Sequence, residues 1–247
     1  MSLIPKSGKA ELHLTYACDL ACPACNRMSV LKKPHTPDMT VEDVREFFRQ
    51  ARALNWAPSI LIIGGEPTAH PAFDEVVRLS REFVGRGLVQ VWSNGYSEQA
   101  REALLWVKRE YDASVPADTH KPEGSRKLSI DDIFCSPKDF GAPTYRHCWN
   151  HSAEICGISV DAAGYSPCAI GGMVDGFLGL GVRTKVLADL FDPEKVAEMS
   201  RRLCEHCGQS KIGSPDAVEW RAWVAKQKKR LGSYMSPTWL EAAKGRK

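Results

Sequence analysis

The first half of the sequence alternates short apolar stretches with amphipathic ones, and this alternation restricts the possible fold more than any other feature. Four stretches have the composition of β-strands: residues 10–17, 59–65, 88–92 and 111–115. Three helices are predicted between them, beginning after Thr40, at Phe73 and after Ser97. Repeated strand–helix units predict an α/β fold with a parallel sheet, either open or curled into part of a barrel.

The second half loses this alternation after about residue 116. Residues 116–185 are rich in Gly, Pro, Cys and aromatic residues, and only residues 156–164 alternate as a strand does. Two more helices are predicted, from Asp192 to Leu203 and from Ser214 to Leu231. We therefore divide the chain into a barrel-type unit, a cysteine-containing region, and a last helix with a basic tail: residues 1–145, 146–213 and 214–247.

Composition and length fit one sizeable core, or a core with a small addition, because 43% of the 247 residues are hydrophobic and 26% are charged. No apolar run reaches the length of a membrane span, and the first residues lack the apolar segment of a signal peptide. We therefore expect a cytoplasmic protein without a membrane partner. Nine cysteines in a reducing compartment favour metal ligation or thiol chemistry over disulfides.

Three cysteines follow the first predicted strand with the spacing C-x3-C-x2-C: Cys18, Cys22 and Cys25. A zinc site closed by protein needs four ligands, which usually come as two pairs. Three thiolates instead suit a [4Fe–4S] cluster in which protein holds three irons and the fourth iron stays open to a small molecule.

Two further motifs follow the second and third predicted strands: Gly64-Gly65-Glu66-Pro67 and Trp92-Ser93-Asn94-Gly95-Tyr96. The two glycines are expected to let backbone approach a ligand closely, and Glu66 can accept a hydrogen bond from an ammonium group. Together with the cysteines, these motifs place polar groups at the carboxyl ends of three successive strands, the face at which barrels of this kind carry their chemistry.

In these motifs the chain resembles the radical S-adenosylmethionine (radical SAM) superfamily. The resemblance implies a partial (β/α)6 barrel and a [4Fe–4S] cluster on Cys18, Cys22 and Cys25, whose open iron is chelated by the amino and carboxylate groups of S-adenosylmethionine. It also implies that the stretch from Gly64 to Pro67 lies at the methionine amino group, and that Ser93 and Asn94 lie near the ribose.

The same resemblance implies the chemistry. An electron from the reduced cluster, delivered by a donor such as flavodoxin or ferredoxin, splits the sulfonium and releases a 5′-deoxyadenosyl radical that takes a hydrogen atom from substrate. The sequence departs from the family at Ala24, where an aromatic residue often packs near the adenine. This departure leaves the adenine contact open.

Six cysteines remain, and they resemble the auxiliary-cluster extensions of the family, called SPASM with two clusters and twitch with one. Six thiolates are too few for two fully ligated clusters, so one auxiliary [4Fe–4S] cluster is expected. Its expected ligands are Cys148, Cys168, Cys204 and Cys207. Cys156 competes for either of the first two places, and Cys135 is left over. A structural zinc on the same cysteines is the alternative, with His147, His151 and His206 as further zinc ligands.

We thus expect a radical SAM enzyme that performs a radical oxidation or rearrangement of a small molecule. Residues 226–247 carry a net charge of +6, which is either a solvated surface or a nucleic-acid contact. The second possibility leaves room for an isomerase acting on a modified nucleobase in DNA or RNA. A non-catalytic iron–sulfur or zinc binding module is the alternative outside enzymes.

Overall fold

The structure is a computed structural model, and its secondary structure begins with a strand shortly before the first cysteines. It describes residues 8–20, 25, 27–28, 37–85, 87–111, 117–119, 134–141, 157–208, 222, 224–226, 229–230 and 235–244. The strands are β1 (Lys9–His13), β2 (Ser59–Ile63), β3 (Val89–Ser93), β4 (Ala117–Thr119), β5 (Ile158–Asp161) and β6 (Gly164–Ser166). The α-helices are α1 (Val41–Ala53), α2 (Phe73–Val84), α3 (Glu98–Tyr111), α5 (Ala169–Leu178), α6 (Pro193–Cys204) and α8 (Pro237–Lys244).

The predicted helix starts are confirmed at the atomic level. Thr40 and Asp43 form the capping box of α1, in which the Thr40 amide donates to Asp43 Oδ2 (2.8 Å) and the Asp43 amide donates to Thr40 Oγ1 (3.1 Å). Asp192 caps α6 by accepting from the amide of Glu194 (2.9 Å), and proline occupies the first helical position. Local sequence therefore determines where these helices begin.

The strands form one sheet in the order β4-β3-β2-β1-β5-β6, which confirms the α/β class. Neighbouring strands are parallel, except that β5 and β6 form an antiparallel hairpin. Strand β1 lies in the middle, since Ala10 is paired with Ile60 of β2 on one side and with Ile158 of β5 on the other. Among the described residues, the two strands beside β1 thus form a hairpin instead of the two further strand–helix units that a (β/α)6 barrel would have.

The predicted strand at residues 111–115 is wrong at its start. Tyr111 is the last residue of α3, and its ring packs edge-on against Trp106 with centroids 5.9 Å apart. Helical spacing continues through this region, because Leu104 and Val107 on the same helix are both buried. The fourth strand lies further along the chain and pairs with Val91–Ser93 of β3.

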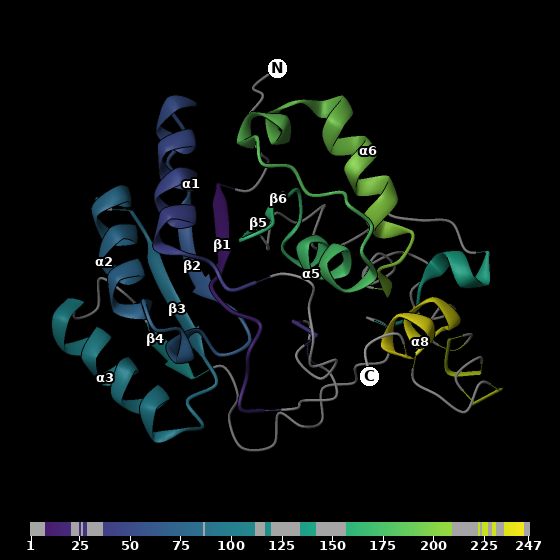
Figure 1. Cartoon of the computed structure of the whole chain (residues 1–247), viewed down its shortest axis with the longest axis horizontal. Coiled ribbons are helices and arrows are strands. Elements are labelled where there is room, and N and C mark those ends of the chain that lie inside the picture. The colour runs from purple at the N-terminus through teal and green to yellow at the C-terminus, as the bar shows by residue number, and fades with distance from the viewer. Residues whose placement is uncertain are drawn as a thin grey trace.

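Helices cover the two faces of the sheet unequally. Figure 1 shows α1, α2 and α3 on one side of the sheet and α5 on the other. Phe47 of α1 contacts Tyr165 of β6 (centroids 5.9 Å apart), whereas Gly172 of α5 lies against Ser159 of β5. A Cβ at Gly172 would come well under 3.0 Å from the Ser159 hydroxyl, so α5 needs glycine there to sit this close to the strand.

The sequence did not predict α5. Its ten residues, AIGGMVDGFL, are nearly all buried and contain three glycines, so they show neither amphipathic spacing nor strong helix propensity. No helix among the described residues combines the length and the apolar character needed to cross a bilayer.

Candidate functional site

The carboxyl ends of β1 and β2 are joined by backbone hydrogen bonds that continue past both strands. The Gly65 amide donates to the Thr15 carbonyl (2.7 Å), and the Glu66 amide donates to the Ala17 carbonyl (2.8 Å). A Cβ on Gly64 or Gly65 would lie well under 3.0 Å from one of these two carbonyl oxygens. The glycines are therefore required by the close approach of two chain segments, and the predicted approach to a ligand stays a prediction.

The Glu66 side chain connects the ends of β2 and β3. Its carboxylate is buried, with Oε1 accepting from the amide (3.1 Å) and hydroxyl (2.7 Å) of Thr68, and Oε2 accepting from the Asn94 amide (2.7 Å). Pro67 begins the short 3-10 helix η2 (Pro67–Ala69) that follows. Carboxylate oxygens have further lone pairs, so the predicted hydrogen bond from an ammonium group is compatible with these three contacts and stays a prediction.

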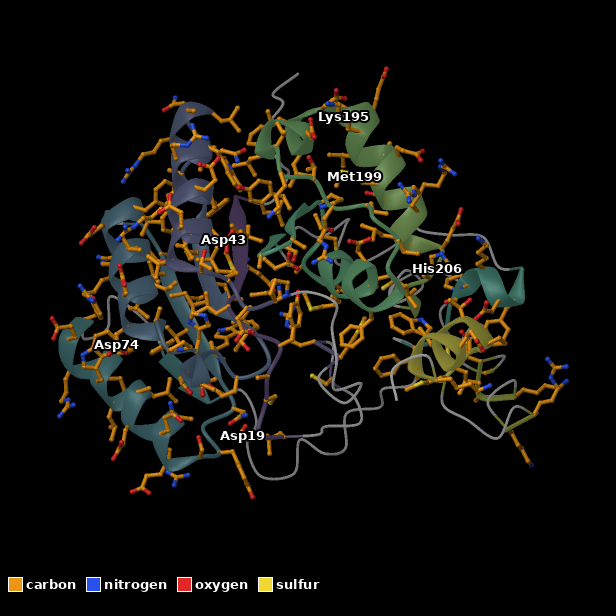
Figure 2. The ribbon with its side chains drawn as sticks, viewed as in Figure 1. Asp19, Asp43, Asp74, Lys195, Met199 and His206 are labelled. Carbon is orange, nitrogen blue, oxygen red and sulfur yellow. The ribbon has the colours of Figure 1, made fainter. Side chains whose placement is uncertain are left out.

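Asn94 joins the third motif to the cysteine loop. Its side-chain amide donates to Asp19 Oδ1 (2.6 Å) and to Cys18 Sγ (3.6 Å), and its Oδ1 accepts from the Tyr96 amide (2.7 Å). Figure 2 shows Asp19 at the bottom of the view, beyond the ends of the strands. Ser93 is buried and its hydroxyl accepts from the Gly95 amide (3.0 Å). The predicted motifs on three strands therefore meet at one edge of the sheet.

Cys18 is a partly buried thiol whose pKa is set by burial and by its neighbours in the loop. Partial burial raises the pKa of the Cys18 thiol, the Leu20 amide lowers it through a hydrogen bond (3.4 Å), and Asp19 and Cys25 raise it electrostatically. Metal ligation would ionise this thiol outright, and N–H donors to sulfur are a usual feature of iron–sulfur sites. Cys22 and Ala24 lie outside the described residues.

Two of the elements that carry the second set of cysteines are also neighbours. Cys168 precedes α5, Cys204 ends α6, and a Cβ on Gly171 would contact both Cys168 and Leu203. Cys148, Cys156, His147 and His151 lie outside the described residues. Within the residues that the structure describes, no three His, Cys, Asp or Glu side chains are gathered as a metal site.

Cys135, which the sequence left over, belongs to a segment that packs on the Cys204–Cys207 turn. The Ser136 hydroxyl donates to the His206 carbonyl (3.3 Å), and the Lys138 amide donates to the Glu205 carbonyl (3.0 Å). Figure 2 shows His206 where the end of α6 meets this segment and α8. The sequence held no signal for this contact, because about 70 residues separate the two segments.

The basic C-terminal stretch is not simply a solvated tail. Trp239 of α8 is fully buried, and its indole Nε1 donates to the His206 carbonyl (2.9 Å). Asp139 accepts from the Thr238 amide (2.9 Å) and from the hydroxyls of Thr238 and Ser236. The charged groups of Lys226 and Lys244 nevertheless point to solvent, so docking of the helix and exposure of the charges coexist.

Comparison with known proteins identifies the strand–helix half. Residues 12–109 match the family model of the radical SAM superfamily. These residues are a radical SAM domain. They include the cysteine loop and both motifs that meet it, and radical chemistry on S-adenosylmethionine is the class of activity that this enzyme domain carries.

Two solved structures of BtrN are similar to the chain as a whole. BtrN in complex with AdoMet and 2-DOIA is 15% identical, with a TM-score of 0.52 over 81% of this chain and 88% of BtrN. SeMet BtrN in an open conformation is 16% identical, with a TM-score of 0.46 over 85% of this chain and 89% of BtrN. The first of these similarities supports the fold around the radical SAM domain. No curated protein sequence matches the chain.

Sequence reasoning missed a set of buried polar residues on the α5 side of the sheet. Its members are Glu11, His13, Tyr16, Arg27, Ser159, Asp161, Asp175 and Arg183. Glu11 and His13 were visible only as the polar half of an alternating strand. The signal that would have found them is their position in a parallel strand, since such strands are usually apolar on both faces.

Proposed function

We propose that the protein is a radical SAM enzyme that cleaves S-adenosylmethionine reductively and performs a radical oxidation or rearrangement of a small molecule. The observation that carries this proposal is the meeting of three motifs at one edge of the sheet, where Asn94 contacts both Asp19 and Cys18. The match of residues 12–109 to the radical SAM family supports the same assignment.

In this proposal Cys18, Cys22 and Cys25 hold the [4Fe–4S] cluster. Gly64, Gly65, Glu66 and Pro67 lie at the methionine end of S-adenosylmethionine, and Ser93 and Asn94 lie near its ribose. The chemistry that the bound cluster and S-adenosylmethionine supply is release of a 5′-deoxyadenosyl radical, which removes a hydrogen atom from substrate. The contact between Glu66 and the Asn94 amide, which joins the ends of β2 and β3, supports this placement.

One auxiliary [4Fe–4S] cluster completes the proposal, on Cys148, Cys168, Cys204 and Cys207, with Cys156 as the alternative to either Cys148 or Cys168. Its support is the packing of α5 beside the end of α6, which brings the chain near Cys168 next to the Cys204–Cys207 turn. We further propose residues 1–145, 146–213 and 214–247 as barrel, auxiliary region and C-terminal region, and a flavodoxin or ferredoxin as electron donor.

A small-molecule substrate is favoured over a nucleobase in nucleic acid. The basic C-terminal stretch supports the latter only by its exposed charges, whereas the polar groups described below lie inside the fold beside the cysteine loop. Exposed Lys and Arg side chains at a chain terminus are more often solvated than bound to phosphates.

The test is anaerobic reconstitution of the full chain with iron and sulfide, followed by dithionite and S-adenosylmethionine. The wild-type protein should form 5′-deoxyadenosine and contain about eight irons per chain, as two four-iron clusters require. Replacement of Cys18, Cys22 and Cys25 together by Ala should abolish 5′-deoxyadenosine formation and leave about four irons.

Cys135→Ala is the matched control, because it removes a buried cysteine that neither proposed cluster uses, and cleavage should persist in it. Cleavage that survives in the triple variant would contradict the radical SAM site. One zinc per chain in place of the second four irons would show that the auxiliary site is a structural zinc.

A further inference from the structure

The α5-facing side of β1 carries charged and polar residues where apolar ones are expected. Glu11 and His13 are buried, and α5 covers the neighbouring strand on the same face through Gly172. Burial of such groups costs free energy unless each finds a partner. The partners of each group therefore reveal which part of this polar layer is complete.

One part of the layer is complete. Asp161 of β5 accepts from the Tyr16 hydroxyl (2.7 Å) and is paired with Arg183 Nη1 (2.5 Å). Arg183 Nε is paired with Asp175 Oδ2 (2.6 Å), and Asp175 Oδ1 accepts from the Val182 amide (2.8 Å). This set connects β5, α5 and the segment after α5, and both carboxylates have partners.

The adjacent part is incomplete. Arg27 Nη2 lies 2.7 Å from Glu11 Oε2 as an ion pair, but Arg27 Nε and Nη1 have no hydrogen-bond partner in the described part of the chain. Neither ring nitrogen of His13 has one there either, and its Nε2 is 3.6 Å from Glu11 Oε2, too far for a good hydrogen bond. Arg27 and His13 are 6% and 0% exposed, so bulk solvent does not reach these nitrogens.

The position of this incomplete part relates it to the cysteine loop. Arg27 follows Cys25 by two residues, and the Met28 amide donates to the Cys25 carbonyl (2.9 Å). Met28 is buried with φ at 58°, a left-handed conformation that costs a non-glycine residue energy. Such strained backbone persists where surrounding structure holds it, and it is concentrated at functional sites.

The charges of the residues in and beside the incomplete part determine which class of ligand can bind there. Glu11 already neutralises Arg27, and the completed set beside it has two carboxylates for one guanidinium, so an anionic ligand would meet repulsion. Burial, with help from Arg27 and Arg183, lowers the pKa of His13 well below its usual value of 6.5, so its ring is neutral and has one donor and one acceptor. Arg27 offers N–H groups only. Together they match neighbouring oxygens of which at least one is a hydroxyl.

We infer that Glu11, His13 and Arg27 form the polar end of the substrate site and that they bind a neutral, polyhydroxylated part of a small molecule. The inference rests on the proposed function for its claim that the ligand is a substrate. Arg27 donates to two ligand oxygens, while His13 donates to or accepts from a hydroxyl, which completes the hydrogen bonds that the chain leaves open.

The experiment measures binding of myo-inositol, D-glucose and D-glucuronate to the full-length reconstituted protein by saturation-transfer NMR titration. This readout is suited to weak ligands and does not respond to the general stabilisation that polyols give to proteins. At least one neutral polyol should bind, and glucuronate, which differs from glucose by a carboxylate, should bind at least tenfold more weakly than glucose.

His13→Phe should weaken polyol binding at least tenfold while keeping an aromatic ring beside Tyr16. His70→Phe is the matched control, since His70 is also buried but its Nδ1 already accepts from the Ala72 amide (3.2 Å), and it should not change binding. No binding of either neutral polyol, tighter binding of glucuronate, or equal binding by His13→Phe would each overturn the inference.

Failure of this inference is distinguishable from failure of the proposed function. Cleavage of S-adenosylmethionine by the wild-type protein without polyol binding would leave the enzyme assignment in place and remove the substrate class. The opposite result is polyol binding that depends on His13 in a protein that does not cleave S-adenosylmethionine. It would support the binding site but contradict its role in a radical SAM reaction.

Discussion

Two adjacent groups of buried charged residues lie on the same face of the sheet, and they differ in how completely they are paired. In the Arg183 group, formed by Tyr16, Asp161, Asp175 and Arg183, both carboxylates and the guanidinium have partners. In the His13 group, formed by Glu11, His13 and Arg27, one ion pair is surrounded by nitrogens without hydrogen-bond partners in the described residues. The difference separates a group that stabilises the fold from a group that is suited to bind a ligand.

Removal of Arg183 should have the largest effect. Arg183→Met leaves Asp161 and Asp175 buried without their cation and should lower the free energy of unfolding by about 3–5 kcal/mol. Urea denaturation at pH 7.5 measures this loss in the free energy of unfolding. Arg45→Met is the control, because the Arg45–Glu75 pair is exposed and contributes less than about 1 kcal/mol. Equal losses in the two variants would show that the Arg183 group does not stabilise the fold.

Removal of the unpaired ring nitrogens of His13 should have a smaller effect on the free energy of unfolding, and of the opposite sign. His13→Phe replaces a buried group that lacks partners, and should raise the free energy of unfolding of the ligand-free protein by about 1–3 kcal/mol. His70→Phe, which removes a hydrogen bond, should instead lower it by about 1 kcal/mol. A marked loss of stability in His13→Phe would mean that His13 is a structural residue.

A third effect is a dependence of the free energy of unfolding on pH. His13 is neutral in the folded protein because burial and the nearby Arg27 and Arg183 lower its pKa, while Tyr16 and Glu11 also face it. The unfolded chain takes up a proton near pH 6.5, so this contribution is fully present above pH 6.5 and is lost as the pH falls below it. The slope is about 1.4 kcal/mol per pH unit. Urea midpoints from pH 7.5 to 5.0 should therefore fall less in His13→Phe than in wild type, and parallel curves would contradict the assignment.

The strand–helix half was predictable because its signals are local. The capping box of α1, the apolar run of β2 and the motifs after β2 and β3 are each contained within a few residues, and parallel strands bring their carboxyl ends to one edge. The meeting of Asn94 with Cys18 and Asp19 follows from that geometry. The fourth strand was placed too early, since helical spacing at the end of α3 resembles a short apolar strand, and the first strand ends at His13, earlier than predicted.

The polar layer was not predictable, because its contacts join residues that are far apart in the sequence. Glu11 meets Arg27 across 16 residues of chain, Asp161 meets Arg183 across 22, and Tyr16 meets Asp161 across 145. Alternation of apolar and polar residues, as in β1, is typical of a strand with one solvated face, but this strand is covered on both faces. In β1 the alternation separates an apolar buried face from a polar buried face. The sequence of the strand alone does not show that the polar face is buried.

The central place of β1 also affects how the chain is made. Strands β1 to β4 are complete once residue 119 has left the ribosome, but the partner for the other edge of β1 is β5, about 150 residues after β1 itself. At typical synthesis rates that edge stays without its partner strand for on the order of ten seconds. An edge with open N–H and C=O groups is where another chain can pair, so nascent copies of this protein should be most prone to aggregation in that interval.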